Sequence, residues 1–489
     1  MPKNANKLII FLLVCYAGAS GQSPRSFVVN GKRIESDTFN ARVTQMMSDV
    51  GVPGLSLAVI GDGRIVYYQT FGYKRLDTRE RVDSNTIFEA ASLSKTFLTY
   101  VVHRLIDEGK LDPDKPLYLY LPYPELEHDA RYKLITTRMV LSHTSGIENW
   151  KRYNNPDTLE ILANPGEKYI YSGEGFVYLS KVVEVILGKS YEQYVEEMVI
   201  QPLGLKRSFL KYTDNGNYPQ NYATGYNSFD KPVEKWKNVQ TSPASGMHLT
   251  AADYATVLLA LFDEKRLSAR EIRSIYHPVI RLMDNNPAIF FGLGLGVQIT
   301  PGDTIVFHNG FNDGFESMMW YSVPHRCGLV LLTNSEREQV LEKPMVDLTT
   351  RFLLGPYFAG DDYEQYPSKA CQLMQLYREK GKEEMLGKME EWEKEGAMGY
   401  KTLNELGQLF TGEDTAIARK MLEDNVKLFP DSAIPWYSLG GLYMNTQQYA
   451  KAYSAFCKAR DLNYDTQRVG AALKNCVRMI NQTQGQSLK

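Results

Sequence analysis

Hydrophobic positions follow two different periods in the first part of the chain. Between residues 36 and 50 they recur every three or four positions, which predicts an amphipathic helix. Two runs rich in β-branched and aromatic residues follow at 55–60 and 64–68, and Gly61-Asp62-Gly63 separates them. Such runs around a glycine-containing turn are typical of a β-hairpin.

A second amphipathic stretch extends from Ser92 to about Glu108, and Gly109 stands where a helix commonly ends. The middle of the chain, residues 115–280, is rich in loops and mainly helical in pattern. Short β-rich segments separated by Gly or Pro turns return late in the chain, at 305–307, 315–322 and 327–333. We therefore predict an α+β domain, with a central antiparallel sheet flanked by helices and a helical subdomain inserted between the early and late strands.

The composition changes beyond about Pro356. Residues 370–398 are charged and helical in pattern, which predicts a solvated connecting helix. The last hundred residues carry a pattern of large and small apolar positions that resembles the tetratricopeptide repeat. The regular copy consists of Trp436, Leu439, Gly440, Tyr443, Ala452, Phe456 and Ala459. An imperfect copy precedes it and consists of Leu406, Gly407, Phe410, Ala418 and Pro430. Two tandem copies predict an all-α module of helical hairpins.

The N-terminus has the layout of a secretory signal peptide, which we assign to residues 1–21. Lys3 and Lys7 precede an apolar run, and small residues follow it. Lipidation at Cys15 is an alternative, which we disfavour because Val14 is bulky where lipoprotein signals carry a small residue. No other apolar run approaches the roughly 20 residues that a membrane helix needs. We expect an exported protein, periplasmic or secreted, without a transmembrane anchor.

Charge and cysteine content exclude several classes. The formal net charge is −2 and no basic stripe is visible, so we expect no nucleic-acid partner. Four cysteines lie outside the signal: Cys327, Cys371, Cys457 and Cys476. They lack a CxxC spacing, so we expect no metal site. No motif indicates a cofactor, and we expect none. Export permits disulfides. Cys457 and Cys476 are the pair best suited to one, and buried free thiols are an equally good alternative.

Ser92-Leu93-Ser94-Lys95 places a serine and a lysine one turn apart at the predicted start of a helix. Residues three apart share a helix face, so the amine can reach the hydroxyl. The helix N-terminus favours developing negative charge. A serine becomes a nucleophile when a base takes its proton, and a desolvated lysine with a lowered pKa can be that base. Alternatively, Ser92 only caps the helix and Lys95 is a surface charge.

The segment Glu89-Ala-Ala-Ser-Leu-Ser-Lys-Thr96 resembles the active-site segment of the class C β-lactamase-like serine hydrolases, a family that includes D,D-peptidases, D-aminopeptidases and esterases. Further segments resemble the family in order: Leu141–Ile147, Pro165-Gly166 with Tyr169–Ser172, Ala244–Thr250, His308-Asn309-Gly310 with Gly314-Phe315, and Leu331–Ser335. The resemblance covers about residues 36–355. It implies a β-lactamase/transpeptidase-like hydrolase domain over 22–355, followed by a charged helical connector over 356–398 and repeats over 399–489.

The resemblance also implies roles for the matched residues. Ser92 would attack a carbonyl and become acylated, while Lys95 and Tyr171 would share the work of the general base. Tyr171 needs a nearby cation to stabilise its phenolate, and Lys95 or a protonated His308 would supply one. The backbone N–H groups of Ser92 and Phe311, which follows Gly310, would form the oxyanion hole. Two other histidines receive structural assignments: His143 in a bracing turn, and His103 in packing or at the surface.

Gly173 departs from the family pattern, because the family carries at this position an asparagine that helps to position substrate and lysine. The change speaks against β-lactam recognition and leaves the nucleophile and base in place. The sequence therefore predicts a serine hydrolase that cleaves an amide or ester (a D-amino-acid peptide, a cell-wall stem peptide or a small ester) through an acyl-enzyme. A decayed binding protein that acts through its repeats, and a true β-lactamase, remain alternatives. The repeats would bind a protein partner, mediate self-association or cap the hydrolase.

Overall fold

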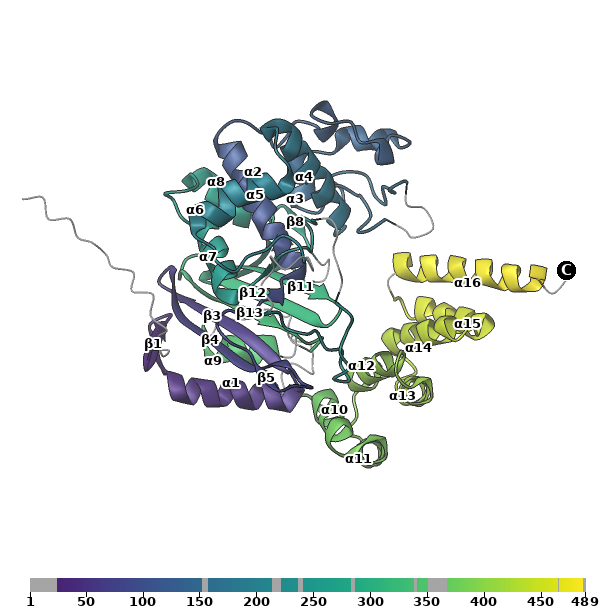
Figure 1. The fold of residues 1–489 in the computed structure, drawn as a ribbon. Helices are drawn as coiled ribbons and strands as arrows, with labels where there is room; N and C mark the ends of the chain where they lie inside the picture. Colours follow the sequence, from purple (N-terminus) through teal and green to yellow (C-terminus); the bar gives the residue numbers. More distant parts are fainter. Residues whose placement is uncertain are drawn as a thin grey trace, which may run out of the picture.

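The chain forms an α+β domain followed by an all-helical C-terminal region in this computed structural model (Figure 1). The predicted signal peptide lies outside the described residues. The structure describes residues 24–151, 157–212, 221–235, 241–282, 286–337, 341–350, 367–464 and 466–486.

Within these ranges, a nine-stranded antiparallel sheet forms the centre of the first domain, in the order β5-β4-β3-β13-β12-β11-β10-β9-β8. The predicted hairpin and the late strands are present. Strand β3 pairs directly with β13, so the two ends of the domain meet in the middle of the sheet. The strands are β3 (Gly54–Gly61), β4 (Arg64–Arg75), β5 (Glu80–Arg81), β8 (Ile280–Arg281), β9 (Ile289–Phe291), β10 (Gly296–Thr300), β11 (Asp303–Asn312), β12 (Phe315–Ser322) and β13 (Cys327–Thr333).

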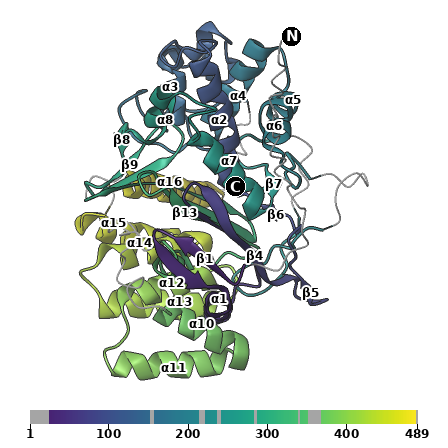
Figure 2. The ribbon, with the colours of Figure 1, turned by 90° about the vertical axis from the view of Figure 1, so that its left-hand side faces the viewer.

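The sheet separates two apolar cores because successive side chains of a strand point to opposite faces. Leu57 of β3 packs in one core, which α1 (Ser36–Val50) and α9 (Glu342–Leu348) cover. Ala58, the next residue, packs in the other core. Helices α2 (Lys95–Asp107), α4 (Gly173–Leu187) and α7 (Ala251–Leu261) cover this second face. Figures 1 and 2 show α1 and α2 on opposite sides of the sheet.

Shorter elements complete the domain and include the helical subdomain inserted between the early and late strands. The α+β architecture predicted from the sequence is therefore confirmed. These elements are helices α3 (Thr137–Leu141), α5 (Tyr191–Val195), α6 (Gln201–Leu203) and α8 (Ala269–Tyr276), and the strand pairs β1 (Ser26–Val29) with β2 (Lys32–Glu35) and β6 (Phe88–Glu89) with β7 (His248–Leu249).

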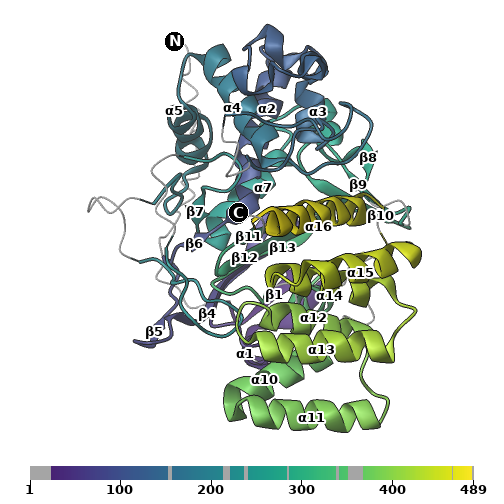
Figure 3. The same cartoon turned by 90° about the vertical axis from the view of Figure 1, so that its right-hand side faces the viewer.

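The C-terminal helical region is a stack of helices in which α16 lies at the far end from α11 (Figure 3). Its helices are α10 (Lys369–Lys380), α11 (Lys382–Lys394), α12 (Tyr400–Phe410), α13 (Thr415–Leu428), α14 (Ala433–Asn445), α15 (Tyr449–Asp461) and α16 (Thr466–Gln486). The glycines of the repeat pattern lie where paired helices approach. A Cβ on Gly407 would lie 2.5 Å from Leu422, and one on Gly440 would lie 2.6 Å from Phe456. The tetratricopeptide-like assignment stays a prediction.

The segment predicted as one solvated connecting helix is instead two helices that share the core of this region. Gly381, with φ 90° and ψ 180°, separates α10 from α11. Leu373 and Met385 are fully buried and belong to one apolar core with residues of α12, α13 and α14. The many charged residues of this segment obscured its few apolar positions in the sequence pattern. These positions form an apolar face on each helix that packs into the core.

The four cysteines of the described chain are free thiols. The suggested disulfide between Cys457 and Cys476 is therefore not formed, and the alternative of free thiols holds for both. Cys476 is buried with its sulfur 3.2 Å from the sulfur of Met444. Within the described ranges, no helix combines the length and the apolarity that crossing a membrane requires.

Candidate active site

Ser92 lies in a single 3₁₀ turn, Ala91–Ser94, that precedes α2. Ala91 adopts a φ of 47°, a left-handed conformation that is uncommon for a residue with a side chain. Ser94 holds the turn in place, because its hydroxyl donates to the Ala91 carbonyl at 2.6 Å and accepts from the Met247 N–H at 2.9 Å. The other three residues of the turn are buried, and Ser92 is partly exposed.

Lys95 is completely buried behind Ser92. Its Nζ lies 3.2 Å from Ser92 Oγ and donates to the Ala244 carbonyl at 2.9 Å. Burial lowers the pKa of Lys95 to about 7, because the interior disfavours the ammonium form. A neutral amine keeps one lone pair after its N–H groups are used, so Lys95 has the geometry and the basicity to accept the Ser92 proton.

Tyr171 shares a hydrogen bond with the Ser92 side chain, and Lys95 Nζ lies 4.7 Å from the centre of its ring. Burial raises the pKa of Tyr171 above its ordinary value of 10. Burial therefore disfavours the phenolate that the sequence analysis expected, and it also drives the neighbouring Lys95 toward its neutral form. Tyr171 is a neutral hydroxyl that can donate.

His308 on β11 is buried, with its ring 6.3 Å from the ring of Tyr171. Burial lowers the pKa of His308 to about 3, so it is not the cation that the sequence suggested. Its Nδ1 lies 2.7 Å from the Asn309 carbonyl, an acceptor, which fixes the N–H on Nδ1. The other nitrogen, Nε2, is then an acceptor, and it has no hydrogen-bond partner among the described residues.

Gly310 lies where β11 meets the turn that carries Ser92. A Cβ at this position would lie 2.8 Å from the backbone nitrogen of Ser92 and 2.6 Å from the Ala90 carbonyl. Only glycine therefore allows this contact. The next residue, Phe311, lines the pocket with its side chain 54% exposed. The oxyanion hole formed by the N–H groups of Ser92 and Phe311 remains a prediction.

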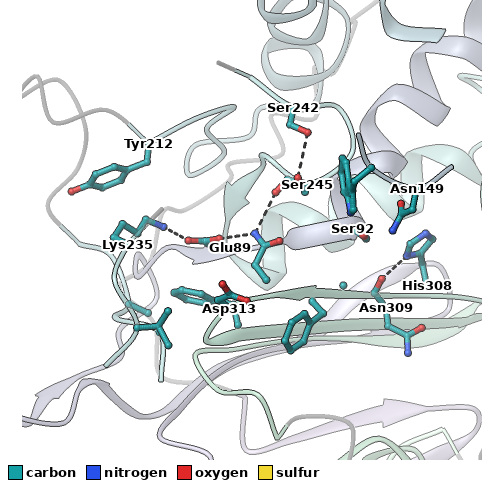
Figure 4. Close-up of a pocket in the computed structure, with 18 of the residues that line it drawn as sticks. Glu89, Ser92, Asn149, Tyr212, Lys235, Ser242, Ser245, His308, Asn309 and Asp313 are labelled. Atoms are coloured by element: carbon teal, nitrogen blue, oxygen red, sulfur yellow. Dashed lines mark hydrogen bonds and ion pairs between the residues drawn. The ribbon is translucent and has the colours of Figure 1, made fainter. Parts of the chain in front are cut away.

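Ser92, Tyr171, His308, Gly310 and Phe311 border one cavity of about 1180 Å³, and Lys95 lies buried behind Ser92. Ser92, Asn149 and His308 lie toward one end of the cavity, and Lys235 and Tyr212 lie toward the other (Figure 4). The structure thus brings together all the residues that the sequence selected, although they come from three separate segments. Those selected residues are Ser92, Lys95, Tyr171, His308, Gly310 and Phe311.

No sequence motif pointed to Lys235, which lies at the far end of the pocket. Lys235 pairs there with buried Glu89, which also accepts a hydrogen bond from Asn312 at 2.6 Å. The rings of Tyr212 and Tyr222 each lie 5.2 Å from the ammonium nitrogen of Lys235. Lys235 belongs to none of the matched segments, so only the fold reveals that it borders the pocket.

The two histidines given structural assignments are both buried. His143 accepts a hydrogen bond from the Ser172 N–H at 3.1 Å, and its ring centre lies 4.2 Å from that of Tyr171. His143 therefore supports the loop segment that carries Tyr171. His103 lies in the interior and not at the surface, with Nδ1 3.1 Å from Glu271 and Nε2 3.0 Å from the Leu293 carbonyl.

Two bacterial proteins are similar in sequence to this chain. Penicillin-binding protein 4* of Bacillus subtilis (strain 168) is 26% identical over 339 residues, 62% of this chain and 73% of its own length. Protein flp of Staphylococcus aureus (strain MW2) is 24% identical over 311 residues, 59% of this chain and 61% of its own length. The chain thus spans about three fifths of the length of this second relative.

Two solved structures share the fold. The octameric penicillin-binding protein homologue from Pyrococcus abyssi is 22% identical, with a TM-score of 0.56 over 66% of this chain and 80% of its own. A class C β-lactamase is 23% identical, with a TM-score of 0.53 over 61% of this chain and 91% of its own. The sequence profile of the Beta-lactamase family matches residues 39–349. The chain is therefore a member of the Beta-lactamase family, a family of serine hydrolases and penicillin-binding proteins.

Proposed function

We propose that this protein is an exported serine hydrolase that cleaves an amide or ester through an acyl-enzyme on Ser92. The observation that carries the proposal is the buried amine of Lys95, which lies 3.2 Å from Ser92 Oγ and has a pKa lowered to about 7. A lysine in that state is a base matched to neutral pH.

The proposed reaction starts with transfer of the Ser92 proton to Lys95 as Oγ attacks the substrate carbonyl. The N–H groups of Ser92 and Phe311 would stabilise the developing oxyanion, at roughly 3 kcal/mol for each donor. Tyr171, held neutral by burial, would donate its proton to the departing oxygen or nitrogen and be reprotonated from Lys95. Water would then hydrolyse the acyl-enzyme with Lys95 again as the base.

The neutral state of His308 narrows the substrate class. The nitrogen of His308 that has no partner among the described residues is the acceptor Nε2, and the ring carries no positive charge. An acceptor suits a donor group or an uncharged part of the substrate and offers no ion pair to a carboxylate. Small esters and uncharged amides therefore rank above penicillins and cell-wall stem peptides, which carry carboxylates.

Export is supported by Lys3 and Lys7 ahead of the apolar run 8–14 and the small residues after it. Cell fractionation with a C-terminal tag would test it. Recovery in the periplasm or the medium, with loss of about 20 N-terminal residues by mass, is the expected result. An uncleaved cytosolic protein would refute export.

A covalent probe tests the catalytic proposal. The protein and its Ser92→Ala variant are incubated with a fluorescent fluorophosphonate and, separately, with a fluorescent penicillin. We expect labelling by the phosphonate that depends on Ser92, together with turnover of small esters. Labelling and turnover of penicillin would favour a true β-lactamase. Absence of labelling by either probe, with no turnover of a broad ester panel, would favour a binding protein that has lost catalysis.

A further inference from the structure

The indole of Trp150 occupies the space beside Gly173. A Cβ built on Gly173 would lie 2.5–2.9 Å from three atoms of the six-membered ring of Trp150. Carbon atoms do not approach this closely, so the indole fits only because residue 173 has no side chain. The glycine that departs from the family pattern is therefore half of a packed pair.

Backbone conformation does not require glycine at this position. Gly173 is the first residue of α4, and its φ lies outside the left-handed region. Ser172 caps the helix with a side-chain hydrogen bond to the Gly175 N–H. Other residues adopt this conformation readily at a helix start. The physical requirement for glycine is thus the space that the indole fills.

The residue before Trp150 fixes the indole in place. The Asn149 carbonyl accepts hydrogen bonds from the N–H groups of Gly173 at 3.1 Å and Glu174 at 3.0 Å, and the Asn149 side-chain oxygen accepts from Gly173 at 2.8 Å. These bonds tie the segment to the start of α4. Because the side-chain oxygen is used in this way, the amide nitrogen is the group that Asn149 presents beside Ser92 and His308 (Figure 4).

Trp150 lines the same cavity as Ser92 and remains 44% exposed. Tyr169 and Phe291 also line this cavity, so its wall contains several aromatic rings. A flat, rigid ring that is partly exposed in a cavity is suited to bind an apolar group of a ligand.

We propose that Trp150, seated on Gly173, is a specificity-determining wall that selects substrates with an extended alkyl or aryl acyl group. The inference rests on the proposed hydrolase function and deepens it by naming the acyl class. Burial of one methylene against an apolar wall contributes about fourfold in binding, so the preference should grow with acyl length.

The kinetic test compares p-nitrophenyl acetate, hexanoate and phenylacetate. We expect the wild-type protein to favour hexanoate and phenylacetate over acetate in kcat/KM, and Trp150→Ala to reduce that preference by at least tenfold. Tyr453→Ala is the matched control, because Tyr453 is an aromatic of similar exposure (38%) on α15, away from the pocket. An unchanged preference in Trp150→Ala would overturn the proposal.

A second test needs no activity. Gly173→Ala is made in the wild-type protein and in Trp150→Ala, and the thermal midpoints of all four proteins are compared. The added methyl should lower the midpoint clearly in the wild type and have little effect without the indole. If Gly173→Ala lowered the midpoint equally in both backgrounds, the indole would not require glycine at position 173. The proposed packing of Trp150 against Gly173 would then be refuted.

The outcomes separate this inference from the proposed function. Fluorophosphonate labelling of Ser92 in every protein, with an unchanged acyl preference in Trp150→Ala, would refute the role of Trp150 in specificity. It would leave the proposed hydrolase function intact. Failure of all labelling and turnover would refute both the hydrolase function and the acyl preference. The thermal comparison would still test whether Trp150 packs in the space beside Gly173.

Discussion

The basicity of Lys95 depends on where its amine lies. No carboxylate among the described residues pairs with this side chain, and burial is the cause of its lowered pKa. The same burial acts on Tyr171 in the opposite direction and keeps the phenol protonated, because the interior disfavours charge of either sign. One base and one acid thus result from a single dry environment.

A pH profile should report this state of Lys95. We expect kcat/KM for a small ester to rise with pH through about 7, because the protonated amine cannot accept the Ser92 proton. His308, with a pKa of about 3, should add no step between pH 5 and 8. Lys95→Arg, which remains charged, should lose at least 100-fold. A flat profile from pH 5 to 9 would contradict the assignment of Lys95 as base.

At the level of elements, the site depends on how closely β11 lies against the turn that carries Ser92. Gly310 makes the approach possible, and Ser317 on the neighbouring strand strengthens it by donating to the Ala90 carbonyl at 2.7 Å. The two strands pair in register, with Gly310 opposite Ser317. The sheet therefore sets the distance between the turn and β11.

Gly310→Ala should lower kcat by about 100-fold or more, the typical effect of losing one oxyanion donor, because the methyl group would push β11 away from Ser92. Gly328→Ala is a matched control. Its methyl group would lie 2.2 Å from the Trp320 carbonyl, within the sheet and outside the pocket. We expect this control to lose stability and to keep most of its kcat. Similar kcat losses in both variants would show that general sheet damage is responsible.

At the scale of the whole molecule, the helical region contacts a loop that also forms the pocket wall. Gly225 and Val233 line the cavity, and Phe229 between them packs on Phe410 and Tyr377, with ring centres 5.0 and 5.8 Å away. Lys231 forms an ion pair with Glu413 in the same junction. The helices thus hold a loop that shapes the pocket.

Phe229→Ala should destabilise the protein by about 1–3 kcal/mol, less than a fully buried phenylalanine because Phe229 is only partly buried. It should also raise KM, since the pocket wall loses its support. Lys231→Ala, which removes an ion pair whose lysine is exposed, should cost less than about 1 kcal/mol. Denaturant unfolding and ester kinetics measure both effects. A KM that stays constant in Phe229→Ala would separate the junction from the pocket.

Buried neutral histidines predict acid sensitivity of the whole fold. Burial lowers the pKa of His308 to about 3 and that of His248 to about 4, while an unfolded chain has a histidine pKa near 6.5. Below pH 6.5 the unfolded state binds protons that the folded state does not, so stability falls as pH falls. Urea unfolding at pH 7, 6 and 5 should give steadily lower midpoints, and His248→Gln should flatten the trend. A midpoint independent of pH would refute this linkage.

Much of the fold was accessible from local pattern. The helix at 36–50, the early hairpin and the late strands each bury a face whose period is written in neighbouring residues. The segment at 370–398 was harder, because its few apolar positions acquire a partner only when α12 and α13 pack against them. The sequence could place chemical groups on elements, and it could not say which elements would be covered.

The sequence by itself determined which groups could react: a serine and a lysine one turn apart, and the tyrosine and histidine segments that follow. The tertiary structure decided their protonation, since burial in the folded chain shifts the pKa values of Lys95, Tyr171 and His308. It also showed that the indole of Trp150 occupies the space that a side chain at Gly173 would need. The physical reason is that burial and close packing belong to pairs of segments, which a linear pattern does not contain.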